Sequence, residues 1–198
     1  MTANRDHSVN ALRQHFQSKI SLTPTETEEL LAAFREKILK KKQILLKPGQ
    51  VAEVRNYVAS GGLRAYVLDK DGNDQTIQFA VEDWWISDYN SYVTRQPATM
   101  FVEAFEDSIV LQLDYETEMK LKKSNHAFET IFRMMAERSA AFQQRRIILA
   151  ITQSAQERYA EFQKRYPSLS HRLPQYALAT YLGMTKEFLS KIRNNRVK

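Results

Sequence analysis

Hydrophobic and polar positions follow three successive patterns along the 198 residues, and each pattern predicts different elements. Up to about Lys37 the chain has a helical pattern, and Thr23-Pro24-Thr25-Glu26 forms a capping box with proline at the first helical position. From Ile38 to Asp114, short runs rich in Val, Ile, Tyr and Phe alternate with turn residues. After Asp114 the helical pattern returns. The sequence therefore predicts an α+β protein with an N-terminal jelly-roll-like β-roll and C-terminal helices.

Two pairs of apolar runs within the middle segment predict β-hairpins. Arg64–Leu68 and Gln75–Phe79 flank an Asp-Gly turn, which is a strong hairpin signal. Thr99–Ala104 and Ser108–Leu113 flank a Glu-Asp pair in the same way. Several short strands at this spacing are typical of a barrel or roll rather than of a parallel sheet.

The segment Ser124–Thr152 contains no Gly or Pro and predicts one long helix of about 40 Å. Apolar residues recur in it at alternating steps of four and three, as in a heptad seam, although Ser139 and Arg146 also fall on that seam. We expect a dimerisation helix whose interface is formed by Phe128, Phe132, Met135, Phe142 and Leu149. The alternative is a long helix that packs on its own barrel.

The residues from Leu173 to Val197 predict a helix-turn-helix. Pro174 opens a helix, Gly183 supplies the position at which a positive φ is cheap, and Thr185 can cap the next helix. A capping box at Ser154 begins the helix before this motif, and it marks a hinge after the long helix. The residues expected to face inward are Ala177, Leu178, Tyr181, Leu182, Phe188, Leu189 and Ile192.

The outward face of the second helix carries side chains of the kinds that read base edges in the major groove of DNA. The predicted DNA-binding residues are Gln175, Thr185, Lys186, Glu187, Ser190, Lys191, Arg193 and Asn194. The distribution of charge along the chain favours the same interpretation: residues 121–198 hold 15 basic and 5 acidic side chains, whereas residues 1–120 hold 14 basic and 18 acidic side chains. A helical hairpin with a solvated basic face is the alternative.

The order of these elements resembles that of the cyclic-AMP receptor (Crp/Fnr) superfamily of transcription regulators. The resemblance rests on Leu45–Gly49, Tyr57–Tyr66 and, most specifically, Gln175–Lys191. It implies a sensor β-roll over residues 1–120, a dimerisation helix and hinge over 121–153, and a DNA-binding domain over 154–198. It also implies a homodimer that binds double-stranded DNA, with Lys186, Glu187 and Lys191 at the family's base-reading positions. Lysine replaces arginine at two of these positions and loses its bidentate geometry.

The family's phosphate-binding cassette is degenerate in this chain. Ile86-Ser87 stand where a Gly-Glu pair is expected, Ala98 stands at the position of the phosphate-binding arginine, and Arg95 lies three residues early. A buried cyclic phosphate without its guanidinium would be an unpaired charge, so we expect that cyclic AMP is not the effector. The alternative is that Arg95 reaches in through a shifted loop.

Aromatic residues replace the cassette. Trp84, Trp85, Tyr89 and Tyr92, together with Arg95, could line a pocket for an unknown small-molecule effector, apolar or aromatic in character. The alternative is that these aromatic residues fill the barrel and its contact with the long helix.

Several function classes are excluded or disfavoured by what the sequence lacks. There is no cysteine, and residues 38–115 contain no histidine, so we expect no catalytic residues, no metal site and no cofactor. No apolar run is long enough for a membrane span and Met1–Asn10 has no signal-peptide core, which predicts a cytoplasmic protein without a membrane partner.

Two other functions remain open at this stage: a cyclic-nucleotide-binding signalling module, and a protein-interaction scaffold with a vestigial helix-turn-helix. Only Asn194–Lys198 follow the recognition helix, so we expect no β-hairpin wing of the kind usual in the family; the alternative is that the chain is a truncation. We expect the wing's phosphate contacts to shift to Lys164, Arg165, Arg172 and Arg196.

Overall fold

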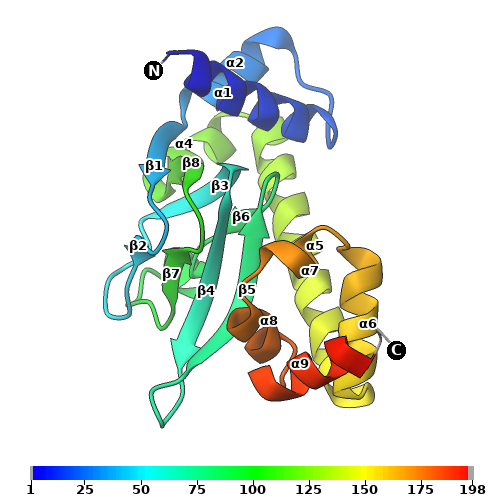
Figure 1. The fold of residues 1–198 in the computed structure, drawn as a ribbon. Helices are drawn as coiled ribbons and strands as arrows, with labels where there is room; N and C mark the ends of the chain where they lie inside the picture. The colour runs from blue at the N-terminus through cyan, green and yellow to red at the C-terminus, as the bar shows by residue number, and fades with distance from the viewer. Residues whose placement is uncertain (1, 196–198) are drawn as a thin grey trace. The chain divides into compact units, whose positions relative to one another are not determined.

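The computed structural model describes residues 2–195 and divides into two compact units. The first comprises the residues up to Ala65 together with Gln78–Ala136, and the second comprises Tyr66–Ile77 together with the residues from Glu137 onward. Figure 1 labels their helices and strands. The functional boundaries expected near residues 120 and 153 stay predictions.

The N-terminal segment forms two helices, α1 (Thr2–Gln17) and α2 (Pro24–Ala32). The capping box at the start of α2 is confirmed: the Thr23 hydroxyl accepts the Glu26 N–H, and the Glu26 carboxylate accepts the Thr23 N–H. The expectation of helix up to Lys37 was wrong, because strand β1 already begins at Arg35. Antiparallel pairing of β1 with β8 fixes this segment, and pairing with a distant strand leaves no trace in local periodicity.

Within residues 2–195, eight strands form two four-stranded sheets, in the orders β1-β8-β3-β6 and β2-β7-β4-β5. Their bounds are Arg35–Leu39 (β1), Ile44–Leu46 (β2), Val54–Ser60 (β3), Gly62–Leu68 (β4), Asp74–Val81 (β5), Trp85–Ile86 (β6), Phe101–Ala104 (β7) and Ser108–Asp114 (β8). The predicted hairpin around Asp71-Gly72 is confirmed as β4 and β5. The α+β class and the β-roll are confirmed as well.

The second predicted hairpin was wrong, because β7 and β8 belong to different sheets. The connection between them passes across the turn at Gly61-Gly62, where the Gly62 N–H donates to the Ser108 hydroxyl oxygen at 2.9 Å. Gly61 has φ +86°, and a Cβ there would lie 2.4 Å from the Asp107 carbonyl oxygen. Phe105, only 5% exposed, anchors the crossing in the core.

Two hydrophobic clusters hold the first unit together. One lies among the β-strands and includes Leu39, Val58, Leu63 and Val110. The other joins the N-terminal helices to β3, β8 and the start of the long helix through buried residues that include Leu12, Phe16, Leu30, Leu31, Tyr57, Leu111, Phe128, Ile131 and Phe132. Two short helices complete the unit, α3 (Tyr89–Thr94) and α4 (Tyr115–Ser124).

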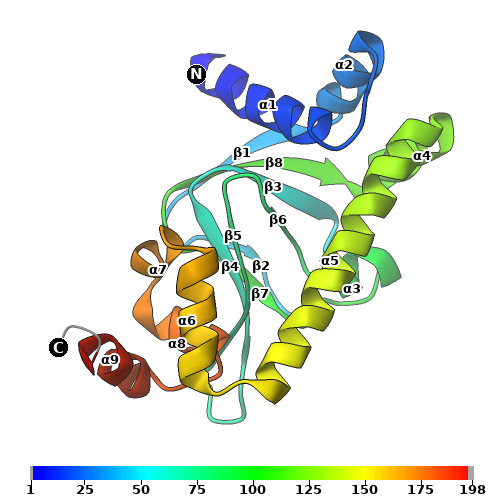
Figure 2. The same cartoon turned by 90° about the vertical axis from the view of Figure 1, so that its right-hand side faces the viewer.

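The long helix α5 covers His126–Thr152, close to the predicted range, and Figure 2 shows it as one continuous helix. It is followed by α6 (Ala155–Arg165), α7 (Leu169–Arg172), α8 (Gln175–Tyr181) and α9 (Lys186–Asn195). The predicted capping box at Ser154 is confirmed by its reciprocal bonds with Glu157. Within residues 2–195, no helix has the length and apolar character needed to cross a bilayer.

Candidate nucleic-acid interface

The turn between α8 and α9 has the predicted geometry. Gly183 adopts φ +67°, a conformation of low energy for glycine that is strained for other residues. The Met184 N–H donates to the Ala179 carbonyl oxygen at 3.0 Å, which closes the corner. The Thr185 hydroxyl accepts the Phe188 N–H at 3.2 Å and caps α9. The two helices contact each other directly and lie side by side in both views (Figures 1 and 2).

The inner face of this helix pair is apolar. Leu189 and Ile192 of α9 are buried, as are Ala177 and Leu178 of α8. Phe188 is the exception, since 40% of it is exposed although we expected it to face inward. It lies at the edge of the apolar stripe, one position before Leu189.

The outer face of α9 brings together most of the predicted DNA-binding residues. One open surface hollow is lined by Gln175, Lys186, Glu187, Ser190, Lys191 and Asn194. Gln175 comes from the first turn of α8 and the other five residues come from α9. Thr185 acts as the cap immediately before them. A single surface therefore presents amine, carboxylate, hydroxyl and amide groups.

Arg193 does not share this surface. Its guanidinium donates to the Tyr159 hydroxyl oxygen at 3.0 Å and to the Ser170 carbonyl oxygen at 2.6 Å. These bonds tie α9 to α6 and α7, so we leave Arg193 out of the interface. The predicted phosphate contacts Lys164, Arg165 and Arg172 are all exposed. Arg165 also lines a separate cavity, and Arg196 lies outside the described residues.

Sequence reasoning missed two exposed aromatic residues of the helix pair. Tyr176 is 43% exposed and Phe188 is 40% exposed. Apolar side chains can contact the methyl group of thymine in the major groove. The signal was present in the sequence, because Phe188 precedes the buried stripe of Leu189 and Ile192 and therefore falls on its boundary.

The residues predicted for the dimer seam lie on a face of α5 that packs against its own chain, so a seam between two copies would have to use another face of this helix. Phe128 and Phe132 are buried in the core of their own chain, and Phe142 and Leu149 line a cavity of the second unit. Met135 packs against the same core as Phe128. The alternative considered above, a helix packed on its own chain, thus describes this face of α5.

The opposite face of α5 carries exposed apolar residues. Ile147 is 61% exposed, Ile148 51% and Ile151 79%. Ala140 and Gln144 are also exposed and continue this face toward the N-terminus of the helix at steps of three and four. This second stripe is the candidate dimer seam.

The aromatic residues of the expected effector pocket surround a cation of the chain itself. The guanidinium carbon of Arg55 lies 5.4 Å from the ring centroid of Trp85 and 5.4 Å from that of Tyr89. The Trp85 indole also donates to His15 and packs against the cluster that includes the N-terminal helices, while Trp84 packs against the cluster among the β-strands. The alternative reading, that these rings fill the protein interior, describes Trp84 and Trp85.

Arg55 is itself neutralised inside the first unit. Its guanidinium lies 3.1 Å from the Glu118 carboxylate, and that carboxylate also accepts the Tyr92 hydroxyl at 2.8 Å. Burial raises the pKa of the Tyr92 hydroxyl, and the neighbouring Glu118 charge raises it further. A buried, fully bonded cluster of this kind is a structural element, because it offers no open position to a ligand.

The residues at the cassette positions are also committed to internal bonds. Arg95 donates to the Ala52 carbonyl oxygen at 2.9 Å and lies over the Tyr115 ring, while the Ser87 hydroxyl donates to the Val54 carbonyl oxygen. Ala98 is 4% exposed. A cavity of about 450 Å³ in this unit is lined by Ser87 together with residues such as Gln50 and Val102, but by none of the residues predicted to line an effector pocket.

A β-roll, a long helix and a C-terminal helix-turn-helix with an exposed polar face follow one another along the chain. The solved structure of FixK2 from Bradyrhizobium japonicum shares this fold, with a TM-score of 0.69 and 20% identity over 82% of this chain and 83% of that one. No family model matches the chain.

Two curated proteins are similar to the chain in sequence. The chain is 24% identical over 170 residues to the "Anaerobic regulatory protein" of Haemophilus influenzae, covering 80% of this chain and 65% of that protein. It is 25% identical over 173 residues to the "Fumarate and nitrate reduction regulatory protein" of Yersinia pestis, covering 80% of this chain and 67% of that protein. The chain is thus similar in sequence to regulators of the Crp/Fnr type, at low identity.

Proposed function

We propose that this chain is a DNA-binding transcription regulator of the Crp/Fnr type that acts as a homodimer. The observation that carries the proposal is the polar face of α9, where five residues share one hollow with Gln175 of α8 while Leu189 and Ile192 are buried behind them. The names of the two curated relatives support a regulatory role. The chain spans only about two thirds of their length, so their activity comes to it as part of this proposal.

The chemistry of the hollow suits direct reading of base edges. Lys186 and Lys191 can donate to the acceptors of guanine, and Glu187 can accept from the amino group of cytosine. Asn194 and Gln175 can bond to adenine, and the exposed Phe188 can contact a thymine methyl group. Thr185 lies at the start of α9, the end that enters the groove in this motif.

Dimerisation follows from the exposed seam of α5. A helix with Ile147, Ile148 and Ile151 on its solvent face leaves apolar surface that a second copy can cover. Gln144 in the same stripe is a polar seam residue of the kind that sets register in paired helices. Two recognition helices about 34 Å apart would then match half-sites one DNA turn apart.

The degenerate cassette argues against a cyclic nucleotide as the signal. Ser87 and Arg95 each donate to a backbone carbonyl oxygen of their own chain, and the arginine expected for a cyclic phosphate is replaced by the buried Ala98. Isothermal titration of the purified chain with cyclic AMP and cyclic GMP separates the two functions. We expect no heat of binding from either, and saturable binding of one of them would favour a cyclic-nucleotide signalling module.

Selection of DNA sequences by the purified chain at stated salt concentration tests the proposed function directly. We expect enrichment of near-palindromic sites with half-sites about 10 base pairs apart. The Lys186→Ala variant should lose discrimination at one base-pair position of each half-site. Equal weakening on all sequences would instead place Lys186 on a phosphate.

Failure to enrich any sequence would contradict the proposal. It would favour an interaction scaffold whose helix-turn-helix is vestigial. A Lys164→Ala variant is the matched control for Lys186→Ala, because Lys164 carries the same charge on the exposed surface of α6 and lies outside the hollow.

A further inference from the structure

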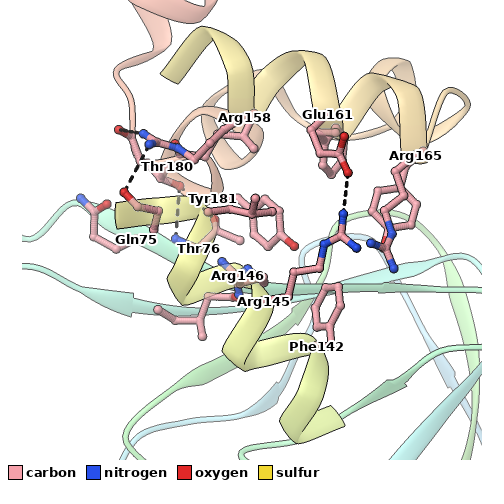
Figure 3. A pocket seen from close by; sticks show the side chains of 17 residues that line it. Gln75, Thr76, Phe142, Arg145, Arg146, Arg158, Glu161, Arg165, Thr180 and Tyr181 are labelled. Atoms are coloured by element: carbon pink, nitrogen blue, oxygen red, sulfur yellow. Dashed lines mark hydrogen bonds and ion pairs between the residues drawn. The ribbon is translucent and has the colours of Figure 1, made fainter. Parts of the chain in front are cut away.

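A second cavity, of about 450 Å³, lies entirely within the second unit (Figure 3). It is bounded by Gln75–Ile77 of β5, by the last turns of α5, and by α6 and α8. Phe142, Leu149 and Phe162 contribute apolar surface to it. Its volume falls within the range of small-molecule binding sites in proteins.

Four arginine side chains line this cavity, against one carboxylate. Arg145 is paired with that carboxylate, since its guanidinium lies 2.8 Å from Glu161. Arg146 lies over the Tyr181 ring, 4.2 Å from the centroid, and donates to the Ile77 carbonyl oxygen. Burial raises the pKa of the Tyr181 hydroxyl, although the charge of Arg146 acts in the opposite direction.

The other two arginines are held by groups that carry no negative charge. Arg158 donates to the Gln153 carbonyl oxygen at 2.6 Å and to the Leu182 carbonyl oxygen at 2.8 Å. Arg165 lies over the ring of Tyr166, with 5.6 Å between its guanidinium carbon and the ring centroid.

Three of the four guanidinium groups therefore keep their positive charge beside an apolar chamber. Within the described part of the chain, the groups of Arg146, Arg158 and Arg165 make no ion pair with a carboxylate. Carbonyl groups and ring faces orient a cation but do not neutralise it. Such a cavity favours a ligand that brings a negative charge together with apolar surface.

We propose that this cavity binds an amphipathic organic anion, with an aromatic or aliphatic body among Phe142, Leu149 and Phe162 and a carboxylate or sulfonate at the arginines. Guanidinium groups suit such oxyanions because their N–H donors match the spacing of two oxygens. Arg158 donates both to the Gln153 carbonyl oxygen at the hinge and to the Leu182 carbonyl oxygen in the helix-turn-helix. The anion would therefore lie beside the side chain that links these two segments. The proposal does not depend on DNA binding and is tested without DNA.

The test uses two fluorescent probes that share one ring system. 8-Anilinonaphthalene-1-sulfonate carries the anionic group, and N-phenyl-1-naphthylamine lacks it. Titration of the full chain should show one saturable site for the sulfonate and about tenfold weaker binding of the neutral probe. Comparable affinities for the two probes would overturn the anion requirement, and absence of saturable sulfonate binding would overturn the site.

Three variants locate the binding and distinguish it from loss of structure. Arg165→Gln should weaken sulfonate binding about tenfold, whereas Lys164→Gln, one residue earlier on α6 and outside the cavity lining, should leave it within about twofold. Glu161→Gln should strengthen binding about threefold, because it removes the one competing carboxylate and releases Arg145. Equal effects of Arg165→Gln and Lys164→Gln, or weaker binding by Glu161→Gln, would contradict the proposal.

Discussion

Replacing Ile147 by alanine is expected to weaken the homodimer by about two orders of magnitude. Ile147 is 61% exposed on the stripe of α5 that also carries Ile148 and Ile151, so association has that surface to cover. The substitution removes three carbon groups worth about 0.8 kcal/mol each when buried, or about 1.5 kcal/mol per copy after scaling by 0.61. A symmetric interface contains two copies, which gives about 3 kcal/mol and about a 150-fold rise in the dissociation constant.

The dimer dissociation constant can be measured by sedimentation equilibrium over a concentration series. Ile38→Ala is the matched control, because Ile38 has the same 61% exposure but lies on strand β1. The control should leave the dissociation constant within about twofold. If the two variants behaved alike, the exposed stripe of α5 would not be the dimer seam.

Four further outcomes follow from contacts in the structure. Lys191→Ala should weaken DNA binding. If the Lys191 amine contacts a phosphate, the slope of log affinity against log salt concentration should also fall in magnitude by about 1. Arg193→Ala should leave that slope unchanged and lower the melting temperature of the protein, because the Arg193 guanidinium bonds inside the domain. Gly183→Ala should destabilise the helix-turn-helix by about 1 kcal/mol in urea unfolding, since φ is +67° and a Cβ would meet only the tip of a flexible side chain at 3.4 Å. Arg55→Met should lower the free energy of unfolding by about 3 kcal/mol in the same assay. This value is at the lower end for the loss of one partner of a buried ion pair, because Glu118 keeps two other partners, Lys122 and Tyr92.

Local chemistry explains which features could be predicted from the sequence. The caps at Thr23, Ser154 and Thr185 each satisfy an N–H group three residues away, so the pattern and its cause lie within one turn. The Gly183 turn is equally local. These signals sufficed to place the helix-turn-helix and, with it, the polar face of α9.

Long-range packing explains the features that could not be predicted. The sequence around β7 and β8 reads as a hairpin, but the crossing over Gly61-Gly62 is set by contacts more than 40 residues apart. The sequence of α5 places apolar residues on two faces of the helix, and periodicity alone does not show which of the two faces packs against its own chain. Burial of Phe128 and Phe132 decides this, and it leaves Ile147 on the free face.

The basic side chains of the C-terminal part fall into two groups with different surroundings, and composition alone does not distinguish these groups. Lys186 and Lys191 lie in an open hollow of α9, where long-range attraction to a polyanion is strongest. Arg146 and Arg158 instead line a cavity with apolar walls and are held by carbonyl oxygens of their own chain. Salt should therefore weaken DNA binding steeply and anion binding in the cavity only slightly, because screening acts mainly on exposed charges. Equal salt dependence of the two processes would mean that the cavity arginines and the lysines of α9 serve one and the same surface.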